Sequence, residues 1–281
     1  MKKEDYIKIV NDKMDKKIRK IMLEQIDKYY NAQEYQRVNK YKKGDVVRLK
    51  KGTLLHGTYK NLDGIKDIVN NGLIASVFTN SRLSKYPSAV SVWNLKKDYV
   101  LKDYIDFYSG GTIKYHGLLI DNEYSQECKS EVIPFSKMNN ITKYILDNQT
   151  RMWTMEQTKE ARFMPSLIQD VVQIGVIFNG DNKYVNELLK GDILDENNID
   201  DDLVKYFINE LYDVDEFINN RHNKDDFFTD RESAILFGVP ASLIEGVLVG
   251  RIYEKDYEIL NEIKRLLPNC YICNLDGVVI L

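Results

Sequence analysis

The residues best suited to chemistry are a histidine, a glycine and a threonine at the end of a short apolar run. His56 is one of three histidines in the chain, and it stands between Leu54-Leu55 and Gly57-Thr58. Gly57 has no Cβ, so a flat ligand can approach its backbone closely. Its N–H and C=O together match a carboxamide, and the imidazole can hydrogen-bond a ribose hydroxyl. Such groups would hold the nicotinamide riboside half of NAD⁺.

A simpler interpretation of the same residues stays open. His56 can be a hydrogen-bonded residue at a strand end, with Gly57 as the turn that follows. The other two histidines offer a different chemistry, a hydrolase built on His116 in KYHGLLI or on His222 in NNRHNKDD. The sequence contains no G-x-S-x-G nucleophile elbow and no H-E-x-x-H zinc motif. His222 lies in a polar stretch typical of a solvated loop.

The elements that must position His56 are two short strands and a helix. The stretch YKKGDVVRLKKGTLLHG, residues 41 to 57, alternates apolar and polar residues and predicts two strands around a turn, with Gly44 and Gly52 as turn residues. The stretch NLDGIKDIVNNGL, residues 61 to 73, has helical apolar spacing and a stop signal at Asn71-Gly72.

Beyond these elements, helices and strands mix without a regular alternation, which favours an α+β fold. Apolar spacing predicts an amphipathic helix over residues 3 to 32 and another over 254 to 267. We expect an N-terminal helical segment, 1–40, and one domain, 41–281, with an acidic helical insertion at about 181–226. The other expected elements are strands over 88–95, 114–122 and 171–180, a helix over 141–163, a loop over 76–90, strand–turn–strand over 227–252 and a hairpin-like end, CYICNLDGVVIL.

Composition limits the classes of protein. The chain has 281 residues, 43% of them hydrophobic, and a formal net charge of −3, so it can bury a large core but has no bulk attraction to nucleic acid or anionic membrane. No apolar window is long enough to span a bilayer and no signal-peptide core is present, so we expect a cytoplasmic protein without membrane partners. Three cysteines do not make a disulfide scaffold. The apolar neighbours of Cys270-Tyr-Ile-Cys273 predict a strand rather than a metal site, and we expect no metal.

Three motifs occur in an order that resembles the ADP-ribosyltransferase superfamily. They are HGT at residues 56–58, I-x-x-I-V-x-x-G-L at 65–73, and E-x-x-x-L-x-G-V-P-x-x-L-I-x-G-V from Glu232. The resemblance is to the branch of diphtheria toxin and the poly(ADP-ribose) polymerases, which has a His, Tyr, Glu triad and includes bacterial toxins and phage-defence enzymes. It covers residues 41–281 and implies a split β-sheet core with helical insertions and NAD⁺ as substrate.

The resemblance implies a role for each matching residue. His56 would contact the nicotinamide ribose, the Gly57 backbone would hold the carboxamide, and Thr58 would complete the cofactor side. Glu232 would bond the ribose 2′-hydroxyl and stabilise the positive charge that develops at the anomeric carbon, an interaction stronger in the transition state than in the ground state. Without the resemblance, Glu232 is interpreted as a carboxylate at the rim of the fold, paired with Arg231 or another basic residue.

The middle position of the triad departs from the family pattern. Ser91 in VSVWNL stands at the expected spacing and fits the serine version, and Trp93 offers an aromatic face. Tyr104 is the reserve for stacking on the nicotinamide ring, together with Tyr99. Asp230, two positions before Glu232, is a candidate for orienting the acceptor.

We therefore expect transfer of ADP-ribose from NAD⁺ to a protein or nucleic-acid acceptor, with release of nicotinamide and a cognate inhibitor or antitoxin as a further partner. The alternatives are an NAD⁺ glycohydrolase and an RNA 2′-phosphotransferase. The second needs a set of phosphate-binding arginines, and Arg48, Arg82 and Arg151 do not form a convincing one. A further alternative is a binding module that has kept the fold and lost the chemistry, using the N-terminal helix and residues 192–226 to bind partners.

Overall fold

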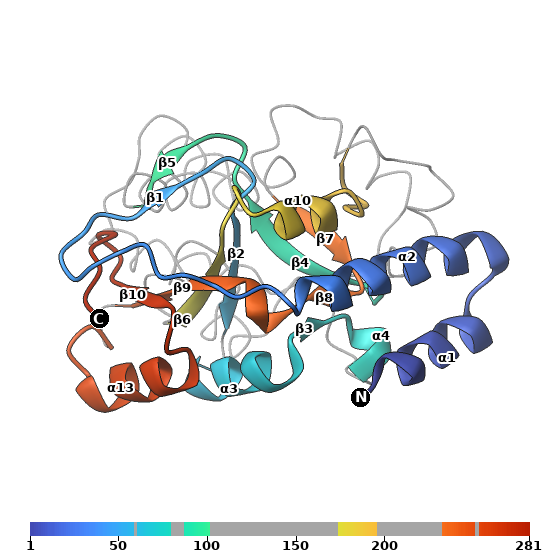
Figure 1. Cartoon of the computed structure of the whole chain (residues 1–281), viewed down its shortest axis with the longest axis horizontal. Helices are drawn as coiled ribbons and strands as arrows, with labels where there is room; N and C mark the ends of the chain where they lie inside the picture. Colours follow the sequence, from blue (N-terminus) through green and yellow to red (C-terminus); the bar gives the residue numbers. More distant parts are fainter. Residues whose placement is uncertain (59–60, 80–86, 102–173, 196–231, 251–252) are drawn as a thin grey trace, which may run out of the picture.

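The computed structural model describes residues 1–58, 61–79, 87–101, 174–195, 232–250 and 253–281 (Figure 1). Tyr104, Asp230, His116 and His222 lie outside these residues. So do the strand expected over 114–122, the helix expected over 141–163 and most of the acidic segment. None of the helices in the described part has both the length and the apolar character needed to cross a membrane.

Two helices form where the sequence predicts one. Helix α1 spans Lys3–Lys13 and α2 spans Lys16–Ala32. Met14 adopts an extended conformation, and the Asp15 carboxylate accepts hydrogen bonds from the N–H groups of Lys17 and Ile18. An aspartate in this role satisfies the free donors at a helix start, so Asp15 begins a new helix and the chain turns there.

Six strands form one mixed sheet in the order β10-β9-β6-β2-β4-β7. Only β10 and β9 are parallel, and every other neighbouring pair is antiparallel. Two further two-stranded sheets pair β1 with β5 and β3 with β8. The strands are β1 Arg48–Leu49, β2 Leu54–Thr58, β3 Leu73–Ile74, β4 Ala89–Asn94, β5 Tyr99–Val100, β6 Ile174–Phe178, β7 Glu232–Leu236, β8 Gly238–Val239, β9 Ile244–Val249 and β10 Tyr271–Cys273.

Strands adjacent in sequence do not pair where the alternation suggested they might. β1 and β2 form on either side of the Gly52 turn as predicted, yet β1 pairs with β5 and β2 pairs with β4 and β6. Similarly, β7 and β9 form within 227–252, but β7 pairs with β4 and β9 with β6 and β10. The C-terminal hairpin-like end is confirmed by the antiparallel bridge of Cys273 with Val279.

The large sheet separates two clusters of buried side chains. The larger cluster lies on the helical side and joins one face of the sheet to the N-terminal helices; its central members are Met22, Ile26, Leu54, Ile65, Val92, Val176, Phe178, Val247 and Ile263. The smaller cluster lies against β1 and the C-terminal end; it consists of Val47, Leu49, Leu55, Trp93, Leu95, Leu101, Ile177, Leu248, Tyr271, Cys273, Leu275 and Val279. Figure 1 shows β1 and β5 across the sheet from α3 and α13.

The remaining helices are short and pack on the larger cluster. They are α3 Asn61–Asn71, α4 Ser76–Thr79, α10 Lys183–Leu189, the 3₁₀ turn η2 Ala241–Leu243 and α13 Tyr257–Leu266. Helices α3 and α13 confirm the predictions over 61–73 and 254–267, and α4 falls in a stretch predicted as loop. Helices and strands thus mix around one six-stranded sheet, as the expected α+β class requires.

Candidate functional site

His56 lies in the middle of the large sheet, on β2, which is flanked by β6 and β4. Its side chain is half-buried, and its Nδ1 is 3.1 Å from the carbonyl oxygen of Ser91 on β4. A carbonyl oxygen can only accept a hydrogen bond, so Nδ1 carries the proton when the ring is neutral. The other ring nitrogen, Nε2, is then an acceptor that can bind a hydroxyl group.

The charge state of His56 follows from its surroundings. Burial of the ring lowers the pKa of His56 below the ordinary value of 6.5, and the hydrogen bond to Ser91 opposes that shift. Burial has this effect because removing water disfavours the charged imidazolium. His56 is therefore neutral at pH 7, which suits a residue that orients a hydroxyl and not one that supplies positive charge.

β2 and β4 stop pairing at the residue before His56. The register of β2 with β4 contains only Leu54 opposite Asn94 and Leu55 opposite Trp93. With β6, in contrast, β2 pairs at all five residues, from Leu54 to Thr58. The imidazole of His56 therefore reaches Ser91 at the point where the backbone ladder between these two strands has ended. In the described part of the chain, no strand pairs with β2 beyond Leu55 on the side that faces β4.

Gly57 and Thr58 continue β2 beyond this point. Gly57 is half-buried and lies opposite Gly175 on β6, so neither residue of that pair has a side chain to cover the backbone. Thr58 is buried, and helix α3 packs directly on it through Gly64. A Cβ on Gly64 would lie 1.7 Å from the Thr58 hydroxyl oxygen. The helix therefore fixes the end of β2 through a contact that only glycine permits.

Three of the residues proposed for the middle position or for stacking on the nicotinamide ring, Ser91, Trp93 and Tyr99, lie on β4 and β5. Ser91 is exposed on β4, and its backbone carbonyl receives the His56 hydrogen bond. Trp93, two residues along, is 6% exposed and packs in the smaller cluster with Leu55. Tyr99 is half-buried on β5, and the Lys97 ammonium lies 5.1 Å from its ring centroid. Ser91 contacts His56 through its backbone carbonyl.

Glu232 begins β7, the strand next to β4. Its backbone is in register with Trp93, which is itself in register with Leu55 on β2. His56 belongs to the next cross-strand row, opposite Val176 on β6. The three strands that carry His56, Ser91 and Glu232 are therefore consecutive in the sheet. The backbones of His56 and Glu232 therefore lie in neighbouring cross-strand rows and do not share a row.

A buried polar cluster next to Glu232 had no signal in the sequence analysis. Asp192 is 3% exposed, and its Oδ1 accepts hydrogen bonds from the N–H groups of Leu194 and Ala234, each at 2.9 Å. The Ser233 hydroxyl is fully buried and accepts a hydrogen bond of 3.0 Å from the Asn94 amide. Burial raises the pKa of Asp192, whereas the hydrogen bonds from Ser233, Leu194 and Ala234 oppose the rise. Asp192 thereby ties the 192–195 segment to the edge of β7 that faces away from β4.

The two C-terminal cysteines lie where a strand was predicted. Cys273 belongs to β10, and Cys270 comes directly before it; both thiols are buried and free. Their hydrogen bonds go to the carbonyl oxygens of Ile244 and Val247 on β9. Burial raises the pKa of each thiol, against the opposing effect of Arg37 on Cys270. In the described residues, no group of three or more His, Cys, Asp or Glu side chains is arranged to hold a metal ion.

Comparisons with protein-family models, curated proteins and solved structures find no match to this chain. The physical arrangement of His56, Ser91 and Glu232 on three consecutive strands is therefore the basis for any functional assignment.

Proposed function

We propose that this protein transfers ADP-ribose from NAD⁺ to a macromolecular acceptor and releases nicotinamide. The observation that carries the proposal is the end of pairing between β2 and β4 at Leu55, directly before His56 and Gly57. Beyond that point the described strands do not pair with the β4 side of β2, so its backbone groups there are the candidates to meet a ligand.

The chemistry of His56 and Gly57 suits the nicotinamide end of NAD⁺. The neutral imidazole donates from Nδ1 to the Ser91 carbonyl, which leaves Nε2 to accept a hydrogen bond from a ribose hydroxyl. Gly57 is half-buried and has no side chain over its backbone, so a carboxamide can approach it. Thr58, held by α3, fixes the strand end at which these contacts would form.

Glu232 has the role of the catalytic carboxylate in this proposal. Nicotinamide leaves as a neutral molecule, and positive charge grows on the ribose ring as its bond to the anomeric carbon breaks. A carboxylate near that charge stabilises the transition state more than the ground state. Asp192 and Ser233 support the strand that carries Glu232, because their hydrogen bonds hold the first residues of β7 in place.

The test measures nicotinamide release by the purified full-length chain incubated with NAD⁺, alone and with cell lysate as a source of acceptors. We expect Glu232→Gln to lower the rate by about 10²–10³. Glu258→Gln, the same change at an exposed glutamate of α13, should leave the rate unchanged. Labelling of the lysate with a fluorescent or biotinylated NAD⁺ would then identify the acceptor. A Glu232→Gln variant with wild-type turnover would rule out the proposed mechanism.

A second candidate function is a binding module with this fold and no catalysis. It is favoured by the register, which places His56 and Glu232 on alternate cross-strand rows. Two groups that act on one ribose must converge, and the backbones of His56 and Glu232 do not share a cross-strand row. Equilibrium binding of NAD⁺ without nicotinamide release, weakened by His56→Ala and insensitive to Glu232→Gln, would favour this module over the transferase.

A further inference from the structure

A strongly basic ribbon lies across the large sheet from α3 and α13 (Figure 1). It consists of residues 48–51 and 96–100, which include β1 and β5, and we call it the basic ribbon. Five of its nine residues are lysine or arginine and one is acidic, whereas the whole chain has a formal net charge of −3. The five basic residues all have exposed side chains; they are Arg48, Lys50, Lys51, Lys96 and Lys97. Positive charge is therefore concentrated on one small surface of an acidic protein.

Backbone pairing brings these cations together from two segments that are distant in the sequence. β1 and β5 pair antiparallel. Further along the same two segments, the N–H of Gly52 donates a hydrogen bond of 2.8 Å to the Leu95 carbonyl oxygen. The chain between these two contacts runs side by side, so the two lysines that follow β1 lie beside the two lysines that precede β5.

The inner face of the basic ribbon is anchored to the protein. Leu49 is 3% exposed and packs in the smaller cluster, together with Val47 and Leu101, which flank the two strands. The Tyr41 hydroxyl donates a hydrogen bond to the Arg48 carbonyl oxygen and accepts one from the Arg48 N–H, each at 3.1 Å. The backbone that carries the cations is thereby held in place, which lowers the entropy cost of binding a ligand there.

Acidic groups neutralise only part of this charge. Asp98, the one acid of the basic ribbon, pairs with the Lys50 ammonium at 3.1 Å and accepts a hydrogen bond from the Lys51 N–H. Asp98, and more weakly Asp181 before α10, raise the pKa of Lys50. The segment before β1 contributes one further acid, Asp45, and three exposed lysines; these are Lys40, Lys42 and Lys43. Exposed ion pairs are weak, so the surface keeps its attraction for anions.

An aromatic ring lies among the cations. Tyr99 of β5 is half-buried against the smaller cluster, and the Lys97 ammonium lies 5.1 Å from its ring centroid. Proteins that bind single-stranded nucleic acid combine a basic surface for the phosphates with aromatic side chains that stack on bases. A membrane surface instead requires large apolar side chains that enter the lipid. Those exposed in the described residues lie outside the basic ribbon; they are Met1, Val38, Val46 and Tyr257.

We propose that the basic ribbon is a docking surface for single-stranded nucleic acid. Its five cations contact phosphates, and Tyr99 stacks on a base. Contacts of these two kinds carry little information about base identity, so the binding depends only weakly on nucleotide sequence. The surface uses no group to which the transferase proposal assigns a role. Nicotinamide release therefore tests one proposal, and nucleic-acid binding tests the other.

The experiment is fluorescence anisotropy of the full-length chain with a labelled single-stranded RNA of mixed sequence, about 12 nucleotides long. We expect a dissociation constant on the order of 1 µM at about 50 mM NaCl. Affinity should fall as salt is added, with a log–log slope of about −2 to −3.5, as for roughly three to five phosphate contacts on a single strand.

Two variants separate the contribution of charge from that of stacking. Lys96→Glu with Lys97→Glu should weaken binding roughly tenfold or more and reduce the salt slope by about 1.4, because two phosphate contacts are lost. Tyr99→Leu keeps an apolar side chain on the smaller cluster and removes the ring. It should weaken binding roughly fivefold at an unchanged salt slope, because stacking releases no counterions.

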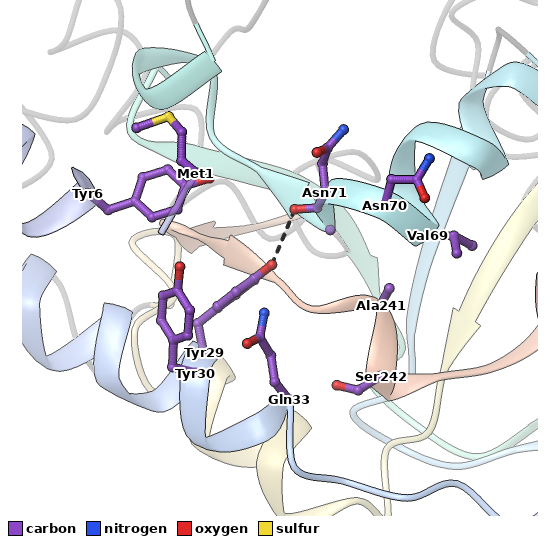
Figure 2. Close-up of a pocket in the computed structure, with 11 residues that line it drawn as sticks. Met1, Tyr6, Tyr29, Tyr30, Gln33, Val69, Asn70, Asn71, Ala241 and Ser242 are labelled. Atoms are coloured by element: carbon purple, nitrogen blue, oxygen red, sulfur yellow. Dashed lines mark hydrogen bonds between the residues drawn. The ribbon is translucent and has the colours of Figure 1, made fainter. Parts of the chain in front are cut away.

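The matched control is Lys16→Glu with Lys20→Glu, the same change in net charge at two exposed lysines of α2. Helix α2 packs on the other side of the sheet, where its Tyr29 hydroxyl donates a hydrogen bond to the Asn71 carbonyl oxygen of α3 (Figure 2). Charges that far from the basic ribbon are screened by salt, so RNA binding should stay within about twofold of the wild type. Because all four lysines are exposed, both charge variants should keep the wild-type thermal midpoint.

Four results would each overturn the proposal. The first is no binding of the RNA at about 50 mM NaCl, and the second is equal weakening by the two lysine pairs. The third is a duplex RNA of the same length bound as tightly as the single strand. The fourth is tighter binding to phosphatidylserine vesicles or to polyglutamate than to RNA, which would assign the basic ribbon to a membrane or to an acidic protein.

Discussion

Gly72 is the position at which local backbone conformation and tertiary packing constrain the sequence together. It follows α3 with a φ of +75°, in the left-handed region that glycine adopts readily. A Cβ at this position would lie 2.2 Å from the Tyr29 hydroxyl oxygen. That hydroxyl also donates a hydrogen bond of 3.4 Å to the Asn71 carbonyl oxygen. We therefore expect Gly72→Ala to destabilise the protein by two separable effects.

The magnitude of each effect follows from the structure. An alanine in the left-handed region costs about 1–2 kcal/mol. Because Tyr29 is 3% exposed and packs on Phe237, its hydroxyl cannot retreat from the new methyl group without disturbing the core. Overpacking of this kind costs about 1–3 kcal/mol more. We thus expect Gly72→Ala to lower the free energy of unfolding by roughly 2–5 kcal/mol.

Gly44→Ala is the matched control. Gly44 has a φ of +92°, and a Cβ there would meet nothing within 4 Å, so this variant reports the backbone effect alone. The assay is urea unfolding followed by circular dichroism, analysed for the midpoint and the slope. Adding Tyr29→Phe to Gly72→Ala removes the oxygen that the methyl group meets and should recover about 1 kcal/mol beyond additivity. Equal losses for Gly72→Ala and Gly44→Ala, or no recovery in the double variant, would refute this reasoning.

Three further predictions concern the strands of the candidate site. Asp192→Ala should lower the free energy of unfolding by about 2–4 kcal/mol, because it leaves the buried N–H groups of Leu194 and Ala234 without an acceptor. Asp192→Asn keeps an oxygen and should cost less in the same urea titration; equal costs would contradict this account. Because the pKa of His56 is lowered on folding, the unfolded chain binds more protons below pH 6.5, and stability should fall as the pH drops from 6.5 to the lower folded value. His56→Gln should reduce that slope, and an unchanged slope would count against the neutral, half-buried imidazole. Gly64→Ala should destabilise the protein by about 1–3 kcal/mol and slow nicotinamide release, because its Cβ would meet the Thr58 side chain. Adding Thr58→Ala to that variant should restore part of the stability and part of the release rate.

The sequence alone determined most of the individual elements in the described part of the chain. Helices α3 and α13 and strands β2, β4, β6 and β10 fall where apolar periodicity predicts them. The stop at Asn71-Gly72 was also predicted, because a glycine in the left-handed conformation ends helices wherever they occur. These signals are local: the period of the apolar residues and the backbone preferences of glycine depend on near neighbours only.

Tertiary structure alone decided which elements meet. The sequence does not show that β2 leaves β4 after Leu55, or that β7 lies beside β4, because pairing depends on which apolar faces a whole chain can bury together. Phe237 shows the same dependence. It adopts a φ of +66°, unfavourable for a phenylalanine, and is held there by its contacts with Tyr6, Tyr29 and Phe78. The neighbourhoods of His56 and Tyr6 therefore belong to the folded chain, since long-range burial brings their partners together.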